Sequence, residues 1–238
     1  FSKTPPQTVS DKIYYQRLNW MSAAFALCAD SAMMTLGGAL KRRERLSARL
    51  GDLLSELYLS SAVLKRFHDE GRLDDDLPLL HWAMQMSLYN MQQSLRSLFG
   101  NLPLRPLAWV LRLLVFPTGY PFHEPSDESD SKAASLLLEP SDARDRLTDG
   151  IFITSDRDEP VGQLEAALGL SVKLDAVEKI IASARKEGRI SGTTADEVFQ
   201  SAYSEEVIND QQLNELRQLE ERRSKVIAVD SFDDWGKG

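Results

Sequence analysis

The chain has 238 residues, of which 42% are hydrophobic, and its formal net charge at pH 7 is -8. This length is enough for one or two domains with sizeable hydrophobic cores. The acidic balance argues against nucleic acid as the main partner, because binding to phosphate groups needs concentrated positive charge.

Three long amphipathic helices are predicted in the first 100 residues, because apolar side chains recur there at steps of three and four. Asp11 is the expected N-terminal cap of the first helix. Gly37 and Gly38 break the pattern before the second helix, and Gly71 is a typical left-handed terminator after it. The expected helices cover residues 11–36, 39–70 and 74–100, and their short joints favour an up-and-down bundle.

The only cysteine, Cys28, lies on the apolar stripe of the first helix. It excludes an internal disulfide and indicates a reducing compartment. We expect it to be a small buried hydrophobic residue. No apolar run in the sequence approaches the ~20 residues needed to cross a bilayer.

The rest of the chain is predicted to form shorter helices, and no alternating pattern indicates a strand. Pro160 suits a helix start, and Ser141 or Asp142 is the expected cap of the helix from residue 141. Helices are expected over residues 106–116, 130–139, 141–148, 160–181, 194–203 and 204–224, followed by a short apolar segment at 226–232. The predicted fold class is all-α: a helical bundle over residues 1–100, an apolar segment and acidic loop over 101–150, and an additional smaller helical segment over 151–238.

A cluster of basic residues opens the second helix, where cations oppose the helix dipole by a few tenths of a kcal/mol each. This cost indicates an anionic partner, which could be carboxylates of another part of the protein, a phosphate group or anionic lipid. A solvated helix face is the simpler alternative. We predict ion pairs to another part of the protein or to a partner subunit for Arg42, Arg43, Arg45 and Arg49, with Lys41 at the rim.

The segment 102–122 is dominated by apolar residues and has two charged side chains, Arg105 and Arg112. A helix that is apolar on nearly all sides is buried in protein or in lipid. Burial against another part of the protein and insertion into a lipid surface both stay open. The residues expected to make this contact are Leu107, Trp109, Val110, Leu113, Leu114 and Phe116.

Motifs that carry chemistry are scarce. The three histidines, His68, His81 and His123, have no metal-binding spacing, so no metal site is expected. The sequence has neither a phosphate-binding Walker loop nor a dinucleotide-binding glycine motif. Therefore, no catalytic, cofactor-binding or metal-binding residue is assigned within the chain.

Two stretches carry a family resemblance: LGGALKRRERLSARLGD at residues 36–52 and FPTG at residues 116–119. With their surroundings they resemble the C-terminal region of the large bacterial acyl-CoA dehydrogenases that oxidise fatty acids. The similarity covers nearly the whole chain and weakens after about Gly162. The region is also similar to the C-terminal helical extension of the mitochondrial very-long-chain enzyme, which packs on the catalytic core and helps with membrane attachment.

The resemblance implies a parent enzyme that converts acyl-CoA to trans-2-enoyl-CoA in fatty acid β-oxidation. It implies FAD as cofactor, bound mainly outside this chain, and an electron-transfer flavoprotein as the oxidant of the flavin. The catalytic glutamate and the flavin-binding residues are then expected upstream of Phe1, and this segment alone is expected to be inactive. It would dock on the dehydrogenase core or on another subunit of a homo-oligomer, in the bacterial cytoplasm or peripherally at the inner membrane.

A free-standing helical adaptor, acting on a partner or a membrane surface without enzyme activity, is the alternative function. The absence of an initiator methionine favours the enzyme segment over the adaptor. A contribution of the segment to binding the acyl chain is a third interpretation.

Overall fold

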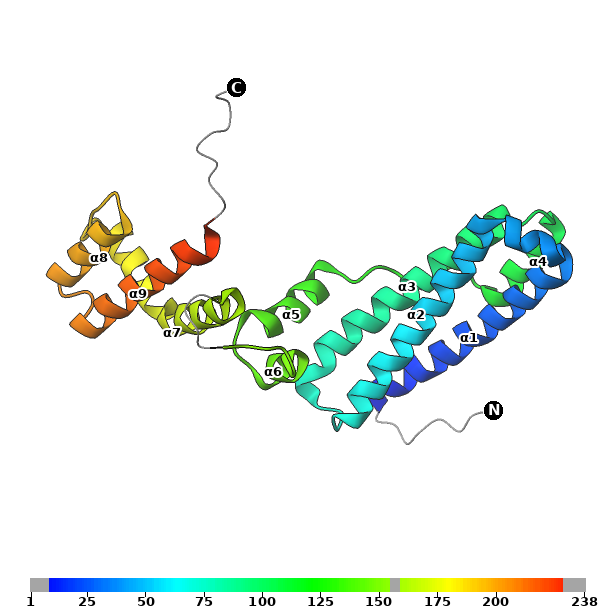
Figure 1. Ribbon diagram of the computed structural model, residues 1–238, viewed down its shortest axis with the longest axis horizontal. Helices are drawn as coiled ribbons and strands as arrows, with labels where there is room; N and C mark the ends of the chain where they lie inside the picture. The colour runs from blue at the N-terminus through cyan, green and yellow to red at the C-terminus, as the bar shows by residue number, and fades with distance from the viewer. Residues whose placement is uncertain (1–8, 155–158, 229–238) are drawn as a thin grey trace, which may run out of the picture. The chain divides into compact units, whose positions relative to one another are not determined.

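The computed structural model describes residues 9–154 and 159–228, with side chains from Asp11 onward. Within these residues it contains nine α-helices, two short 3-10 helices and no strand, so the all-α prediction is confirmed (Figure 1). The chain divides into two compact units, an N-terminal unit of residues 1–134 and a C-terminal unit of residues 135–238.

The N-terminal unit is built on three long helices, α1 (Val9–Leu36), α2 (Glu44–Asp69) and α3 (Leu77–Asn101), as predicted. The break at Gly37 and Gly38 is the 3-10 helix η1 (Gly37–Arg42), and the acidic triplet before α3 is η2 (Asp74–Asp76). Gly71 follows α2 with a φ of 92°, which only glycine adopts readily. The shorter α4 (Arg105–Val115) comes next, and α5 (Asp127–Leu138) crosses the boundary between the units.

The prediction that Asp11 caps the first helix is wrong. Helix α1 already begins at Val9, and the fully buried Asp11 lies inside its first turn. Its carboxylate lies 3.5 Å from Nε of Arg72, the residue that follows the α2 terminator. Asp11 therefore ties the start of α1 to the turn between α2 and α3.

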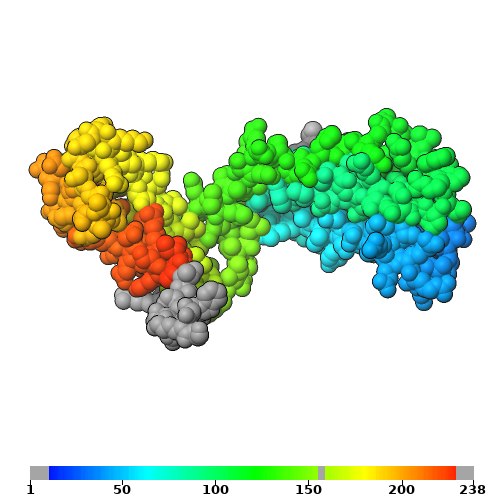
Figure 2. Space-filling model, turned by 90° about the horizontal axis from the view of Figure 1, so that it is seen from above, coloured from blue at the N-terminus to red at the C-terminus, as the bar shows by residue number. Residues whose placement is uncertain are grey.

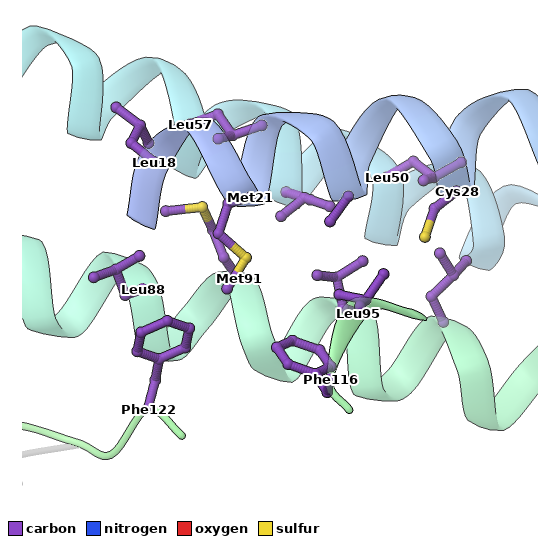
Figure 3. Packing of buried hydrophobic residues seen from close by; sticks show 14 of the residues in the cluster. Leu18, Met21, Cys28, Leu50, Leu57, Leu88, Met91, Leu95, Phe116 and Phe122 are labelled. Carbon is purple, nitrogen blue, oxygen red and sulfur yellow. The ribbon is translucent and has the colours of Figure 1, made fainter. Parts of the chain in front are cut away.

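The core of the N-terminal unit lies between α1, α2 and α3 and extends to the segment after α4 (Figure 3). Met21 of α1 and Met91 of α3 point toward each other at its centre, and both are fully buried. Cys28 is buried in the same core, as predicted. The remaining fully buried large side chains of this unit are Leu53, Leu64, Met84, Leu88, Leu95, Leu98 and Leu111.

The chain returns along α3 after α4, and one side chain fixes it there. Gln92 of α3 is 2% exposed; its Nε2 donates to the carbonyl of Phe122 (2.7 Å), and its Oε1 accepts from the Phe122 N–H (3.0 Å). The ring of Trp20 on α1 lies 5.9 Å, centre to centre, from both Phe116 and Phe122. The segment 116–122 is thus part of the core of this unit.

The C-terminal unit contains α6 (Asp142–Thr148), α7 (Pro160–Lys186), α8 (Ala195–Ser204) and α9 (Asp210–Ile227). Its core is formed by apolar side chains of α7, α8 and α9, among them Leu174, Ile181 and Leu216. The predicted helix from residue 204 instead begins at Asp210, because Asn209 caps it in a box with Gln212. Residues 229–232 of the predicted apolar segment lie outside the described residues.

Candidate functional site

The basic cluster lies on η1 and the first turns of α2. Lys41, Arg42, Arg43 and Arg45 are all exposed. The turn itself is held by backbone and hydroxyl groups: the Arg43 N–H donates to the Leu40 carbonyl (3.0 Å), and Ser47 Oγ donates to the same oxygen (3.1 Å). No ion pair links these four cations to any carboxylate among the described residues.

Arg49 differs from the other four basic residues of the cluster in its burial and in its contacts. It is half-buried, and its Nε donates to Oγ of Ser97 on α3 at 2.7 Å. Two turns further, Nδ2 of Asn90 donates to Glu56 at 3.0 Å and again joins α3 to α2. Arg49 is therefore a contact within the bundle, whereas the four cations before it face solvent.

Helix α4 has one buried face and one exposed face, although its sequence is apolar on both. Ala108, Leu111 and Val115 are buried, Leu107 packs against the same core, and the following Phe116 is buried. On the outward face Trp109 is 64% exposed and Leu113 is 65% exposed. The other exposed apolar residues of this face are Leu104, Val110 and Leu114.

The two arginines of the α4 segment are held at its ends. Nη1 of Arg105 donates to the carbonyls of Phe99 (3.2 Å) and Gly100 (2.9 Å), which are at the C-terminal end of α3. The guanidinium of Arg112 lies 5.8 Å from the centre of the Tyr120 ring, which is close enough for a cation–π contact. Both contacts fix the orientation of α4 on the bundle.

The basic cluster and the exposed face of α4 lie at the same end of the N-terminal unit. Helix η1 packs on α1 and α2, while α4 packs on α3 and α1. Leu36 and Leu40 next to the basic residues, and Leu107 of α4, all pack against the same core. In Figures 1 and 2 the blue segment around η1 and the green segment of α4 lie at this common end.

A small groove of about 270 Å³ lies elsewhere on the N-terminal unit and is lined by Tyr14, Arg17 and Phe122, among others. Beside it, the Tyr14 hydroxyl lies 2.8 Å from Nδ1 of the half-buried His81. Burial lowers the pKa of His81, because the imidazolium loses its hydration. Burial also raises the pKa of Tyr14, and the positive charge of Arg17 opposes that rise. Both shifts favour the uncharged forms of the two side chains, which lie within hydrogen-bond distance of each other.

The groove at Tyr14 and the groove at residues 203–212 do not suit the flavin that the family resemblance implies. The groove at Tyr14 is smaller than typical pockets for small molecules. Two larger, open grooves belong to the C-terminal unit: one of about 520 Å³ at Ile181 and Phe199, and one of about 720 Å³ at residues 203–212. Carboxylates of Glu206 and Asp210 line the larger of these, and they would repel a pyrophosphate.

No group of three or more His, Cys, Asp or Glu side chains among the described residues is placed to hold a metal ion. The buried thiol of Cys28 is also unsuited to nucleophilic chemistry. Desolvation raises its pKa to about 12, so that it stays protonated at neutral pH.

The helical stretch Asp11–Arg42 is long and apolar enough to cross a membrane by length and composition, with a mean hydropathy of 1.4. The prediction that no apolar run approaches the length of a membrane span is therefore wrong. Core helices of soluble proteins pass the same test. Met21, Ala24 and Cys28 place one side of α1 in the core, but only 17% of the apolar stretch is buried. Its other side is exposed and carries Leu27, Met33 and Met34 together with polar residues such as Gln16 and Asn19.

The comparisons with known proteins agree with the resemblance seen in the sequence. The family model for "Acyl-CoA dehydrogenase, C-terminal, bacterial type" matches residues 1–232. No solved structure matches the chain significantly. The chain belongs to the family of bacterial-type acyl-CoA dehydrogenase C-terminal domains.

Proposed function

We propose that the chain is the structural C-terminal region of a flavin-dependent acyl-CoA dehydrogenase of fatty acid β-oxidation in the bacterial cytoplasm. The parent enzyme converts acyl-CoA to trans-2-enoyl-CoA, binds FAD outside the described residues and passes electrons to an electron-transfer flavoprotein. The region itself docks on the dehydrogenase core or on a partner subunit. Family membership supports the reaction of the parent enzyme.

The observation that carries the docking role is the apolar outward face of the long helices. On α2, Tyr58 is 74% exposed and Leu54 is 52% exposed, and the small residues Gly51 and Ser55 lie on the same outward face. Small residues let a neighbouring helix approach closely, and contiguous exposed apolar surface is typical of interaction sites. On α1, the apolar side chains of Leu27, Met33 and Met34 are likewise exposed.

The chemistry of the reaction explains why the catalytic role belongs to the flavin-binding part of the parent enzyme and a structural role to this chain. Removing a hydride from the β-carbon needs a cofactor, because no protein side chain accepts a hydride. The bound flavin supplies that acceptor in the parent enzyme. The described residues of this chain contribute packing surfaces, and their buried polar groups, such as Gln92 and Ser60, are occupied with hydrogen bonds inside the bundle.

The docking role is tested in the full-length enzyme with Leu54→Asp plus Tyr58→Asp. Both side chains are exposed in the bundle, so the double variant keeps the helical content of this chain. We expect it to lower the melting temperature of the enzyme and to weaken its assembly, because charges are placed in an apolar contact. The matched control is Lys12→Asp plus Lys65→Asp, which also places carboxylates at exposed helix positions. Equal melting and assembly in wild type, variant and control would contradict docking through α2.

A further inference from the structure

A half-buried cation lines the small groove at Tyr14, and no acidic side chain among the described residues pairs with it. Arg17 of α1 lines this groove together with Gln85 of α3 and the segment 121–123. No ion pair joins Arg17 to a carboxylate within residues 9–154 and 159–228. A guanidinium that is partly removed from water loses hydration, and an oxygen partner offsets this loss. Arg17 therefore lacks the kind of contact that its burial requires.

Other half-buried arginines of the same chain show what this contact looks like. Four of them each reach an oxygen atom of the fold, namely Arg49 (Ser97), Arg72 (Asp11), Arg144 (Glu165) and Arg223 (Glu178). The guanidinium of Arg17 instead lies over the ring of Phe122, 5.6 Å from its centre. No oxygen in the part of the chain that the structure describes accepts a hydrogen bond from Arg17. The comparison indicates that its oxygen partner comes from outside the bundle.

The position of Arg17 is set by the core and does not depend on a ligand. Phe122 is 8% exposed, and its backbone N–H and carbonyl are both held by Gln92. A contact with a ring uses none of the five N–H groups of a guanidinium, so these donors keep their hydrogen-bonding capacity. A cation that is already oriented loses less conformational freedom when it binds a ligand. The stacking of Arg17 on Phe122 therefore prepares it for an acceptor.

The groove beside Arg17 suits a small anion with several oxygen atoms. Its volume is about 270 Å³. One water molecule occupies about 30 Å³, so an ion with four oxygens fits together with some of its water. His123 also lines the groove, and an imidazole keeps one N–H donor even when it is uncharged. Gln85 donates to the carbonyl of Glu124 at 3.0 Å and fixes the segment after Phe122 beside the groove.

We infer that the groove at Tyr14 binds a small oxyanion, which is a phosphate or a carboxylate group, with Arg17 as its cation. The guanidinium donates two parallel N–H···O bonds to the anion, as that of Arg144 does to the two carboxylate oxygens of Glu165. A whole nucleotide or flavin is too large for this groove. The inference goes beyond the proposed function and does not depend on it.

The test titrates the full-length protein with inorganic phosphate at constant ionic strength and follows the line width of the phosphorus NMR signal. Arg17→Met keeps an apolar stem over Phe122 but removes the charge and the donors, so it should weaken phosphate binding by about tenfold or more. Arg17→Lys keeps the charge without the forked donors and should bind with intermediate affinity. The matched control is Arg96→Gln, which should bind as wild type does. Arg96 also lies over a ring, 5.4 Å from the centre of Tyr120, but does not line the groove.

Competition in the wild-type protein identifies the anion. Displacement of phosphate by sulfate supports a site for phosphate groups, and displacement by acetate supports a site for carboxylates. Displacement by chloride at the same concentration would overturn the inference, because the site would then respond to charge alone. Equal phosphate binding in wild type and Arg17→Met would also overturn it, since the ion would lie elsewhere in the enzyme, and so would an absence of phosphate binding by wild type. If Arg17→Met does not fold, Arg17→Lys decides: weaker binding supports the inference and unchanged binding overturns it.

Discussion

Replacing Gln92 by leucine tests whether one buried amide fixes the segment after α4. The change removes both hydrogen bonds to Phe122 and leaves its N–H and carbonyl without that partner in a buried place. Each buried backbone group that loses its partner costs about 1–3 kcal/mol. The additional apolar contact of leucine offsets about 1 kcal/mol. We therefore expect the free energy of unfolding of the N-terminal unit to fall by about 3 kcal/mol.

Urea unfolding followed by tryptophan fluorescence measures this loss, because the ring of Trp20 lies 5.9 Å from that of Phe122 and reports on their packing. The control is Gln93→Leu on the neighbouring, half-buried position of α3, which should change the free energy by less than about 0.5 kcal/mol. If Gln92→Leu unfolds at the same urea concentration as wild type, the segment 116–122 does not depend on this amide and our account of the core extension is refuted.

Three further predictions concern single residues of the N-terminal unit. Burial lowers the pKa of His81 in the folded state, so the unfolded chain takes up a proton at a higher pH than the folded chain does. The contribution of His81 to the free energy of unfolding is therefore complete above the usual pKa of 6.5 and is lost as the pH drops below it. His81→Gln should remove this part of the decline in the urea midpoint of unfolding. Cys28, with a pKa of about 12, should not react with a thiol reagent at about pH 8 until the protein unfolds; rapid labelling of the native protein would contradict its burial. Arg49→Ala should lower the free energy of unfolding by about 1–2 kcal/mol, because Ser97 loses its hydrogen-bond partner. Arg45→Ala should change this free energy by less than about 0.5 kcal/mol. Equal losses of stability for both variants in thermal melts would contradict the distinction between a bound Arg49 and a solvent-facing Arg45.

The helices of this protein were predictable because their signals are local. The spacing of leucines on α2, the glycines at 37 and 38, and the proline at 160 each act within one or two turns of their own position. The start of α9 was misplaced by six residues, because a cap at Asn209 outweighs the continuous charged pattern around it. Asp11 resembled a cap in sequence, but its role depends on Arg72, 61 positions later, which no local pattern indicates.

The candidate site was predicted in parts but not as a whole. The sequence indicated the basic cluster and the apolar helix separately, and only the packing of η1 and α4 on the same bundle brings them to one end. The sequence of α4 is apolar on all sides, so it does not indicate which face packs on the bundle. Leu111, which is buried, and Leu113, which is exposed, have the same chemistry. The role of Gln92 was missed, although a lone amide between Leu88, Met91 and Leu95 on a core stripe is a signal that sequence reasoning can use.

The most direct test of the central claim compares the full-length protein with the isolated chain of residues 9–228. Both are incubated with a long-chain acyl-CoA and an artificial electron acceptor, and the formation of trans-2-enoyl-CoA and the flavin absorbance are measured. We predict flavin and turnover in the full-length protein, and neither of them in the isolated chain, which should nevertheless show the helical circular dichroism of a folded protein. Enoyl-CoA formation by the folded isolated chain, or its absence with the flavin-loaded full-length protein, would contradict the account.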